Sequence, residues 1–101
     1  MASVQEFFDS LPGRVSSDRI AGMTNTYVFD IEGAGTWTVA IADGVLNVTE
    51  GDSGGDVTIS ASEESFEKIV AGEQNPTTAY MTGKLKIKGD MGAAMKLQKL
   101  F

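Results

Sequence analysis

Four short stretches that alternate apolar and polar residues constrain the fold of this chain more than any other feature. They cover residues 26–32, 36–42, 45–50 and 56–60. Within each stretch most of the apolar side chains fall on one side, as in a β-strand with one buried face. Asp43-Gly44, between the second and third stretches, is a strong signal for a two-residue hairpin turn. We therefore predict four strands in an antiparallel meander, each with one apolar face.

A helix is predicted ahead of these strands, at residues 3–11. Ser3 can cap its first turn, and Glu6 lies at the position of a capping-box partner. Apolar residues recur at helical spacing within the segment, so one face is apolar. The Pro12-Gly13 dipeptide is expected to end the helix.

The chain becomes helical again after the fourth strand, and a fifth strand follows. Ser62 is a suitable N-cap for a helix that ends at Gly72, and Pro76 can open a second, short helix. Residues 84–88 alternate as a fifth strand, and a last helix begins at Met91. Strands and helices that segregate in this way indicate an α+β fold. We expect a five-stranded, largely antiparallel sheet covered on one face by helices.

The absence of certain residue types excludes several classes of function. With 101 residues it is expected to form a single domain over residues 1–101. It contains neither Cys nor His, which excludes disulfides, thiolate catalysis, a Ser-His triad and the usual zinc ligands. The neighbouring carboxylates Glu63 and Glu64 suit the first turn of a helix, and Asp52 and Asp56 suit a glycine-rich turn. We therefore expect no enzymatic activity, no cofactor and no metal.

The chain carries no evident signal for export or membrane insertion. No apolar run approaches the length needed to span a bilayer, and the first residues lack the basic and apolar regions of a signal peptide. We expect a cytoplasmic protein.

Charge is distributed unevenly along the chain. The net charge of −6 argues against nucleic-acid binding, which requires cations to replace phosphate counterions. Residues 84–101 nevertheless carry five Lys and one Asp, whereas residues 1–83 carry three basic and thirteen acidic residues. These lysines either form the solvated face of one strand or make a basic patch for an anionic membrane or an acidic partner. The residues concerned are Lys84, Lys86, Lys88, Lys96 and Lys99.

The remaining candidates for function are apolar. Several aromatic residues and methionines could simply fill a core. Met91 and Met95, however, lie four residues apart on the last helix, and methionine suits surfaces that accept varied apolar partners. The small residues between them would let the helix approach the sheet closely, or would leave space beneath it. Gln98 falls on nearly the same face and could offer its amide to a ligand or to an ordered water.

The segment from Met81 to Gln98 reads Met-x-Gly-Lys-Leu-Lys-Ile-x-Gly-Asp-Met-Gly-x-Ala-Met-Lys-Leu-Gln. This long, ungapped pattern resembles the C-terminal signature of the sterol carrier protein 2 family, and the order of elements is similar over nearly the whole chain. The chain departs from the pattern at Asp90, where Asn is common, and at Ala93, where Leu is common. The resemblance implies a five-stranded sheet and helices that enclose an apolar tunnel for sterols, fatty acids or acyl-CoA.

The resemblance and the apolar pattern together predict the residues that line this tunnel. They are Phe29, Trp37, Val39, Ile41, Leu46, Val48, Phe66, Ile69, Met81, Leu85, Ile87, Met91, Met95 and Gln98. The five C-terminal lysines are predicted to contact anionic membranes.

We therefore predict a non-catalytic, intracellular lipid-binding or lipid-transfer domain, whose partners are a lipid ligand and, transiently, an anionic membrane surface. The alternative is an interaction or lipid-presenting module with the same fold and a filled core, which acts through its basic C-terminal edge. Neither the oligomeric state nor the particular lipid follows from the residues.

Overall fold

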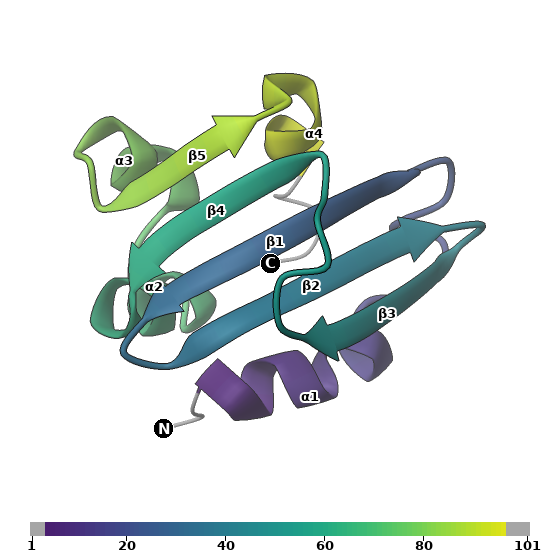
Figure 1. Cartoon of the computed structure of the whole chain (residues 1–101), viewed down its shortest axis with the longest axis horizontal. Coiled ribbons are helices and arrows are strands. Elements are labelled where there is room, and N and C mark those ends of the chain that lie inside the picture. The colour runs from purple at the N-terminus through teal and green to yellow at the C-terminus, as the bar shows by residue number, and fades with distance from the viewer. Residues whose placement is uncertain (1–3, 97–101) are drawn as a thin grey trace.

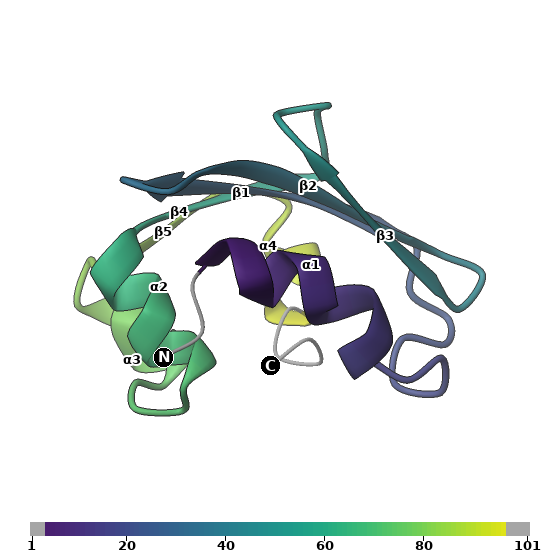
Figure 2. The same ribbon diagram turned by 90° about the horizontal axis from the view of Figure 1, so that it is seen from below.

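The computed structural model describes residues 4–96, which form a five-stranded sheet with four helices on one face (Figure 1). The strands are β1 (Asn25–Glu32), β2 (Gly35–Ala42), β3 (Val45–Glu50), β4 (Val57–Ser62) and β5 (Leu85–Gly89). The helices are α1 (Val4–Arg14), α2 (Glu63–Val70), α3 (Pro76–Met81) and α4 (Met91–Met95). Figure 2 shows the curved sheet edge-on, with all four helices beneath it. The predicted α+β class and the helical cover on one face are confirmed.

The first three strands form the antiparallel meander that the sequence predicts. The strand order is β3-β2-β1-β4-β5, and β2 pairs antiparallel with both β1 and β3. Asp43 and Gly44 both adopt positive φ angles, of 54° and 74°, at the hairpin between β2 and β3. Two consecutive positive φ angles match the twist of the flanking strands, which explains the choice of Asp-Gly.

The fourth strand does not continue the meander, and this part of the prediction is wrong. β4 lies beside β1 and runs parallel to it, so the sheet is mixed. The connecting residues 51–56 cross the face of the sheet that carries no helices (Figure 1). The Thr38 hydroxyl fixes this crossing, because it donates a hydrogen bond to the Gly51 carbonyl (2.6 Å) and accepts one from the Ser53 N–H (3.0 Å).

β5 forms the edge of the sheet beyond β4. The two strands are antiparallel, with Ile59 opposite Ile87. Because successive side chains of a strand point to opposite faces, Leu85 and Ile87 face the helices and Lys84, Lys86 and Lys88 face away from them. This strand therefore separates an apolar side from a cationic side.

Aromatic rings fill the space between the sheet and the first two helices. Phe8 is fully buried, and its ring stacks on Trp37 at 4.6 Å and on Phe66 at 5.5 Å between centroids. Phe29 lies 5.2 Å from the same ring. This cluster occupies the centre of the core with protein side chains.

The first helix is longer than the sequence predicts. It continues through Pro12 to Arg14, and the Val15 N–H still bonds to the Leu11 carbonyl at 3.2 Å. Pro12 lies in the last turn of the helix, so few helical hydrogen bonds follow it.

The last helix begins where the sequence predicts, because α4 starts at Met91. Two residues with predicted roles, Gln98 and Lys99, lie outside the described residues. No helix within residues 4–96 is long and apolar enough to cross a membrane.

Candidate functional site

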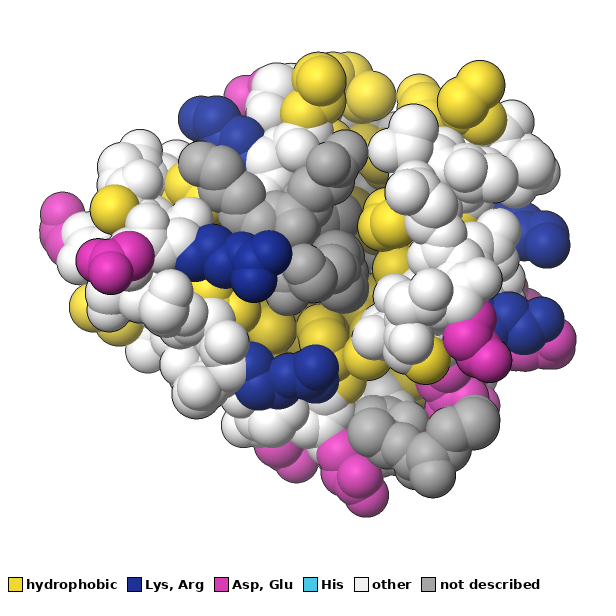
Figure 3. Space-filling model, turned by 180° about the vertical axis from the view of Figure 1, so that it is seen from behind, with side chains coloured by type: hydrophobic (Ala, Val, Ile, Leu, Met, Phe, Trp, Pro, Cys, Tyr) yellow, Lys and Arg dark blue, Asp and Glu magenta, His cyan; other side chains and the backbone are white. Residues whose placement is uncertain are grey.

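An apolar pocket of about 270 Å³ opens where α3, β5 and α4 meet. Its lining residues are Pro76, Thr77, Tyr80, Leu85, Ile87, Met91, Ala94 and Met95. In Figure 3, hydrophobic side chains gather over these two helices at the top of the molecule. Thr77 and Tyr80 supply the only side-chain hydroxyls of the lining described here. The pocket can therefore accept an apolar group and offers few polar contacts.

The pocket has a buried floor and an exposed rim. Leu85 and Ala94 are buried, and Ile87 is partly buried beside them. Met91 and Met95 lie on the rim, and Met95 is 74% exposed. A floor of branched and small side chains under flexible methionines is a surface that can adapt to differently shaped apolar groups.

Polar caps hold the two helices of the pocket in place. The side-chain oxygen of Asn75 accepts hydrogen bonds from the Thr77 N–H (2.8 Å) and the Thr78 N–H (3.3 Å) at the start of α3. Asp90 accepts from the Gly92 N–H (2.9 Å) and the Ala93 N–H (3.2 Å) at the start of α4. These bonds satisfy N–H groups that have no partner within the helix.

Gly89 makes the turn that leads from β5 into α4. Its φ angle is +120°, and a Cβ atom at this position would collide with the backbone of Asp56 and Val57. Only glycine fits this close approach without displacing the backbone. The glycine in the predicted Gly89-Asp90 turn thus fixes where α4 begins on the helical face of the sheet.

A buried tyrosine of the sheet holds α4 by a hydrogen bond. The Tyr27 hydroxyl, on β1, donates a hydrogen bond to the Ala93 carbonyl at 2.6 Å. Burial, and to a smaller extent the negative charges of Asp56 and Asp90, raise the pKa of Tyr27 to about 12. The phenol therefore remains a neutral donor well above the pH at which an ordinary tyrosine ionises.

The raised pKa of Tyr27 predicts a loss of stability at high pH. Above pH ~10 the unfolded chain loses the tyrosine proton while the folded chain keeps it, so the free energy of unfolding falls by about 1.4 kcal/mol per pH unit up to pH ~12. Urea unfolding between pH 7 and 11 measures this slope.

In Tyr27→Phe the free energy of unfolding at neutral pH is expected to be about 1–3 kcal/mol lower, because the Ala93 carbonyl loses its donor. The free energy of unfolding of Tyr27→Phe should also fall less steeply with pH above pH ~10, because the variant lacks the phenol. The same slope in Tyr27→Phe and in the unmodified protein would contradict the raised pKa of Tyr27.

The structure divides the predicted tunnel residues into two groups. One group lies in or against the aromatic core: Phe29, Trp37, Val39, Ile41, Leu46, Val48, Phe66 and Ile69. The other group lines the pocket: Leu85 and Ile87, which also belong to or pack against the hydrophobic core, and the exposed Met91 and Met95. Met81 belongs to neither group, because it lies at the end of α3 with 79% of its surface exposed. No residue of the first group lines this pocket, and the shared role of the two groups as a tunnel lining stays a prediction.

Several pocket residues were not predicted. Pro76 and Tyr80 lie four residues apart on α3 and therefore share a face of that helix, which the sequence could have indicated. Ala94 was noticed as a small residue, but its position on the floor depends on how closely α4 approaches β5.

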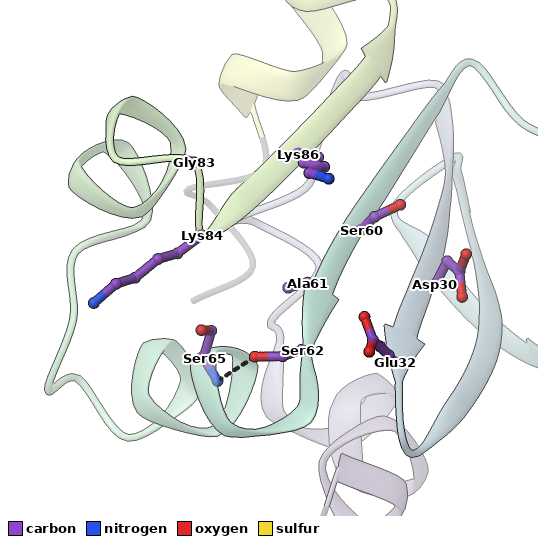
Figure 4. A pocket seen from close by; sticks show the side chains of 9 residues that line it. All are labelled: Asp30, Glu32, Ser60, Ala61, Ser62, Ser65, Gly83, Lys84 and Lys86. Atoms are coloured by element: carbon purple, nitrogen blue, oxygen red, sulfur yellow. Dashed lines mark hydrogen bonds between the residues drawn. The ribbon is translucent and has the colours of Figure 1, made fainter.

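The structure describes four of the five predicted membrane-contact lysines, all of them exposed, and their contact with a membrane stays a prediction. Lys84 and Lys86 line a polar depression of about 510 Å³ on the face of the sheet without helices. Asp30 and Glu32 line the same depression, so its positive and negative charges balance. In Figure 4, however, Lys84 points away from both carboxylates and past the edge of the sheet. Lys88 and Lys96 are also exposed, and neither lines this depression.

The fold and the pocket define a class of small α+β domain, with one layer of helices on a mixed sheet and an apolar pocket beside an edge strand. The sequence matches the SCP-2 sterol transfer family over residues 6–101, nearly its whole length. The chain belongs to this family, whose members bind lipids.

Three similar proteins place the domain in different contexts. Hydroxysteroid dehydrogenase-like protein 2 from Danio rerio is 36% identical over 101 residues, 96% of this chain and 24% of that protein. The chain thus spans about a quarter of the length of the curated relatives it matches. The sec-alkylsulfatase Pisa1 from Pseudomonas sp. contains a similar fold with a TM-score of 0.82 and 25% identity, covering 98% of this chain and 16% of that one. Palmitated SCP2L2 from Aedes aegypti has a TM-score of 0.75 at 22% identity, covering 98% of this chain and 94% of that one.

Proposed function

We propose that this chain binds and carries a lipid whose apolar part occupies the pocket between α3, β5 and α4. The observation that carries the proposal is the continuous apolar lining of this pocket, from the buried floor at Leu85 to the exposed methionines of the rim. The palmitated state of the Aedes aegypti protein is consistent with a fatty acyl ligand. We further propose that the chain acts as one domain in the cytoplasm, without catalysis of its own.

The size of the pocket favours an acyl chain over a sterol. Pockets that enclose drug-sized ligands usually measure about 300–1,000 Å³, and this pocket, at about 270 Å³, falls just below that range. A flexible chain can place as many methylene groups in the pocket as it accommodates, and can leave the remainder outside. A rigid sterol ring system cannot be divided in this way.

The affinity of saturated fatty acids is expected to depend on chain length up to a limit. Each buried methylene contributes about 0.8 kcal/mol, a factor of roughly four in affinity before ordering costs are subtracted. We therefore expect affinity to rise by up to fourfold per methylene and then to level off when the pocket is full. Displacement of a fluorescent fatty acid by a series of chain lengths measures this dependence.

Two outcomes would contradict the proposal. Absence of saturable binding to folded protein would mean that the pocket takes no fatty acid. Affinity that does not change with chain length would mean that binding occurs through the carboxylate, away from the apolar pocket.

A second candidate function is an interaction or lipid-presenting module that serves a catalytic domain. The aromatic core around Phe8 favours this candidate, because protein side chains occupy the centre of the fold. The similarity to parts of two longer proteins, a dehydrogenase-like protein and a sulfatase, also favours it. Native mass spectrometry separates the two candidates: a lipid adduct retained through purification supports the carrier, and a ligand-free mass with no saturable probe binding supports the module.

A further inference from the structure

Opposite charges are arranged in rows on the face of the sheet that carries no helices. Asp30 lies opposite Ser60 in the pairing of β1 with β4, and Ser60 lies opposite Lys86 in the pairing of β4 with β5. Residues that are opposite each other in a sheet point to the same face. A carboxylate, a hydroxyl and an ammonium group therefore form one row across three neighbouring strands.

A second row repeats this order two residues along the strands. Glu32 lies opposite Ser62 in the pairing of β1 with β4, and Lys84 directly precedes β5 at the end of the row. Both rows line the polar depression, and Figure 4 shows the two carboxylates on β1, the serines on β4 and the lysines on the other side of β4. We call Asp30 and Glu32 the acidic column, and Lys84 and Lys86 the lysine column.

The two columns do not neutralise each other within one chain. Two strand spacings of about 4.8 Å separate them, so they lie about 10 Å apart, well beyond the reach of an ion pair. None of the four charged groups forms an ion pair or a side-chain hydrogen bond with a residue of 4–96. The face therefore offers all four charges to a partner whose columns stand in the reverse order.

A second copy of this chain presents that reverse order after a twofold rotation. The axis runs parallel to β4 between the two facing sheets, level with Ser60 and Ser62. Rotation about this axis places β1 of one copy over β5 of the other. The acidic column of each copy then faces the lysine column of its partner, so the surface is complementary to itself.

We propose that two copies of this chain associate face to face through these columns. Asp30 pairs with the partner's Lys86, and Glu32 pairs with the partner's Lys84. Sheets that pack face to face lie about 10 Å apart, a gap that a long lysine opposite a shorter acidic side chain can span. The depression of about 510 Å³ gives the partner's lysine side chains room to enter.

The overall charge of the chain makes the order of the columns decisive. Each copy carries a net charge of −6, so two copies repel each other unless opposite charges meet locally. The contact covers only three strands of each sheet, and small interfaces of this kind are typically weak. We therefore expect a concentration-dependent dimer. The apolar pocket between α3, β5 and α4 opens on the helical side and takes no part in this contact.

Sedimentation equilibrium of charge variants, from about 10 µM to about 500 µM protein, tests this association. The acidic double variant is Asp30→Lys with Glu32→Lys, and the lysine double variant is Lys84→Glu with Lys86→Glu. In either variant like charges face each other across the interface. Each exposed ion pair contributes up to about a fivefold gain in association, so replacing four attractions by four repulsions should weaken the dimer at least a hundredfold.

The fourfold variant, which carries all four substitutions, exchanges the two columns. Its net charge equals that of the unmodified chain, because two acidic and two basic residues change places. Each column again faces its opposite in the partner. The fourfold variant should therefore dimerise within about threefold of the unmodified protein, although each double variant does not.

A matched control separates local pairing from overall charge. Asp18→Lys with Glu73→Lys changes the net charge as the acidic double variant does, at exposed positions outside the depression. This control should dimerise at least as strongly as the unmodified protein, because the general repulsion falls while the columns remain.

Cross-linking through single cysteines tests the orientation without changing any charge, since the chain contains no cysteine of its own. Ser60 lies at the axis, whereas Thr49, on the same face, belongs to β3, three strands away from β4. The two Thr49 positions of a dimer should therefore lie roughly 29 Å apart. A bismaleimide linker of about 10 Å should join two Ser60→Cys chains and should leave Thr49→Cys chains separate.

Four results would overturn the proposed dimer. They are a monomer at every concentration, a dimer that the double variants retain, a folded fourfold variant that stays monomeric, and cross-linking at Thr49→Cys in place of Ser60→Cys. Circular dichroism and binding of a fluorescent fatty acid report whether each variant is folded, because none of the substituted residues lines the apolar pocket. If a charge variant fails to fold, the cross-links of the two cysteine variants still decide the orientation.

Discussion

Replacing Phe8 by Ala is expected to lower the free energy of unfolding by about 3–5 kcal/mol. The Phe8 ring is fully buried and contacts four other aromatic rings, and two of these contacts are stacked. Removal of the ring leaves a cavity that neighbours on α1, β1 and α2 cannot all collapse to fill. Domains of this size have total stabilities of about 5–15 kcal/mol, so the variant would be close to unfolding.

Urea denaturation followed by Trp37 fluorescence measures this loss. The control is Val45→Ala, which removes an exposed side chain and should change the free energy of unfolding by less than about 0.5 kcal/mol. A loss below 1 kcal/mol in Phe8→Ala would indicate that the aromatic core has spare room. Such a result would favour a tunnel through the core over the pocket at its edge.

Replacing Ile87 by Glu is expected to lower the affinity for a fatty acid at least a hundredfold. Ile87 projects from β5 into the pocket, partly buried beside Leu85. In the empty protein a carboxylate at this position can remain in contact with water. A bound acyl chain would remove that water and leave the charge without a partner, which costs several kcal/mol.

A graded series of carboxylates supports the test. Met95→Glu places the same charge on the exposed rim, where water continues to solvate it. The affinity for a fatty acid should therefore fall by no more than about tenfold. Met81→Glu lies outside the pocket lining and should leave the affinity unchanged. Ile87→Val keeps the site apolar, so its affinity for a fatty acid should fall only a few fold. Equal affinities of Ile87→Glu and Met81→Glu, measured by fluorescent displacement, would contradict the placement of the ligand.

Local sequence signals predicted the parts of the fold that depend on neighbouring residues. The Asp43-Gly44 hairpin is an example, because its two positive φ angles follow from the turn chemistry alone. The position of β4 was not predictable in this way. It depends on the pairing of β4 with β1 and on the two hydrogen bonds between Thr38 and the crossing segment, all of which join residues more than ten positions apart.

The candidate site was predictable only in part, for a physical reason. Alternation on β5 correctly placed Leu85 and Ile87 on the helical side of the sheet. An apolar residue in a filled core and one in an open pocket have the same sequence pattern, however. Trp37 and Phe66 both stack on Phe8 of α1 and neither lines the pocket, an arrangement that no local pattern contains.

The location of a bound acyl chain is the most direct test of the proposed function. A titration of isotope-labelled protein with palmitate, followed by nuclear magnetic resonance of methyl groups, measures it residue by residue. We predict saturable shifts at Leu85, Ile87, Met91 and Met95, with little change at the core methyl groups of Val39 and Ile41. Shifts concentrated at Val39 and Ile41, with none at the pocket residues, would contradict the pocket and place the ligand within the core.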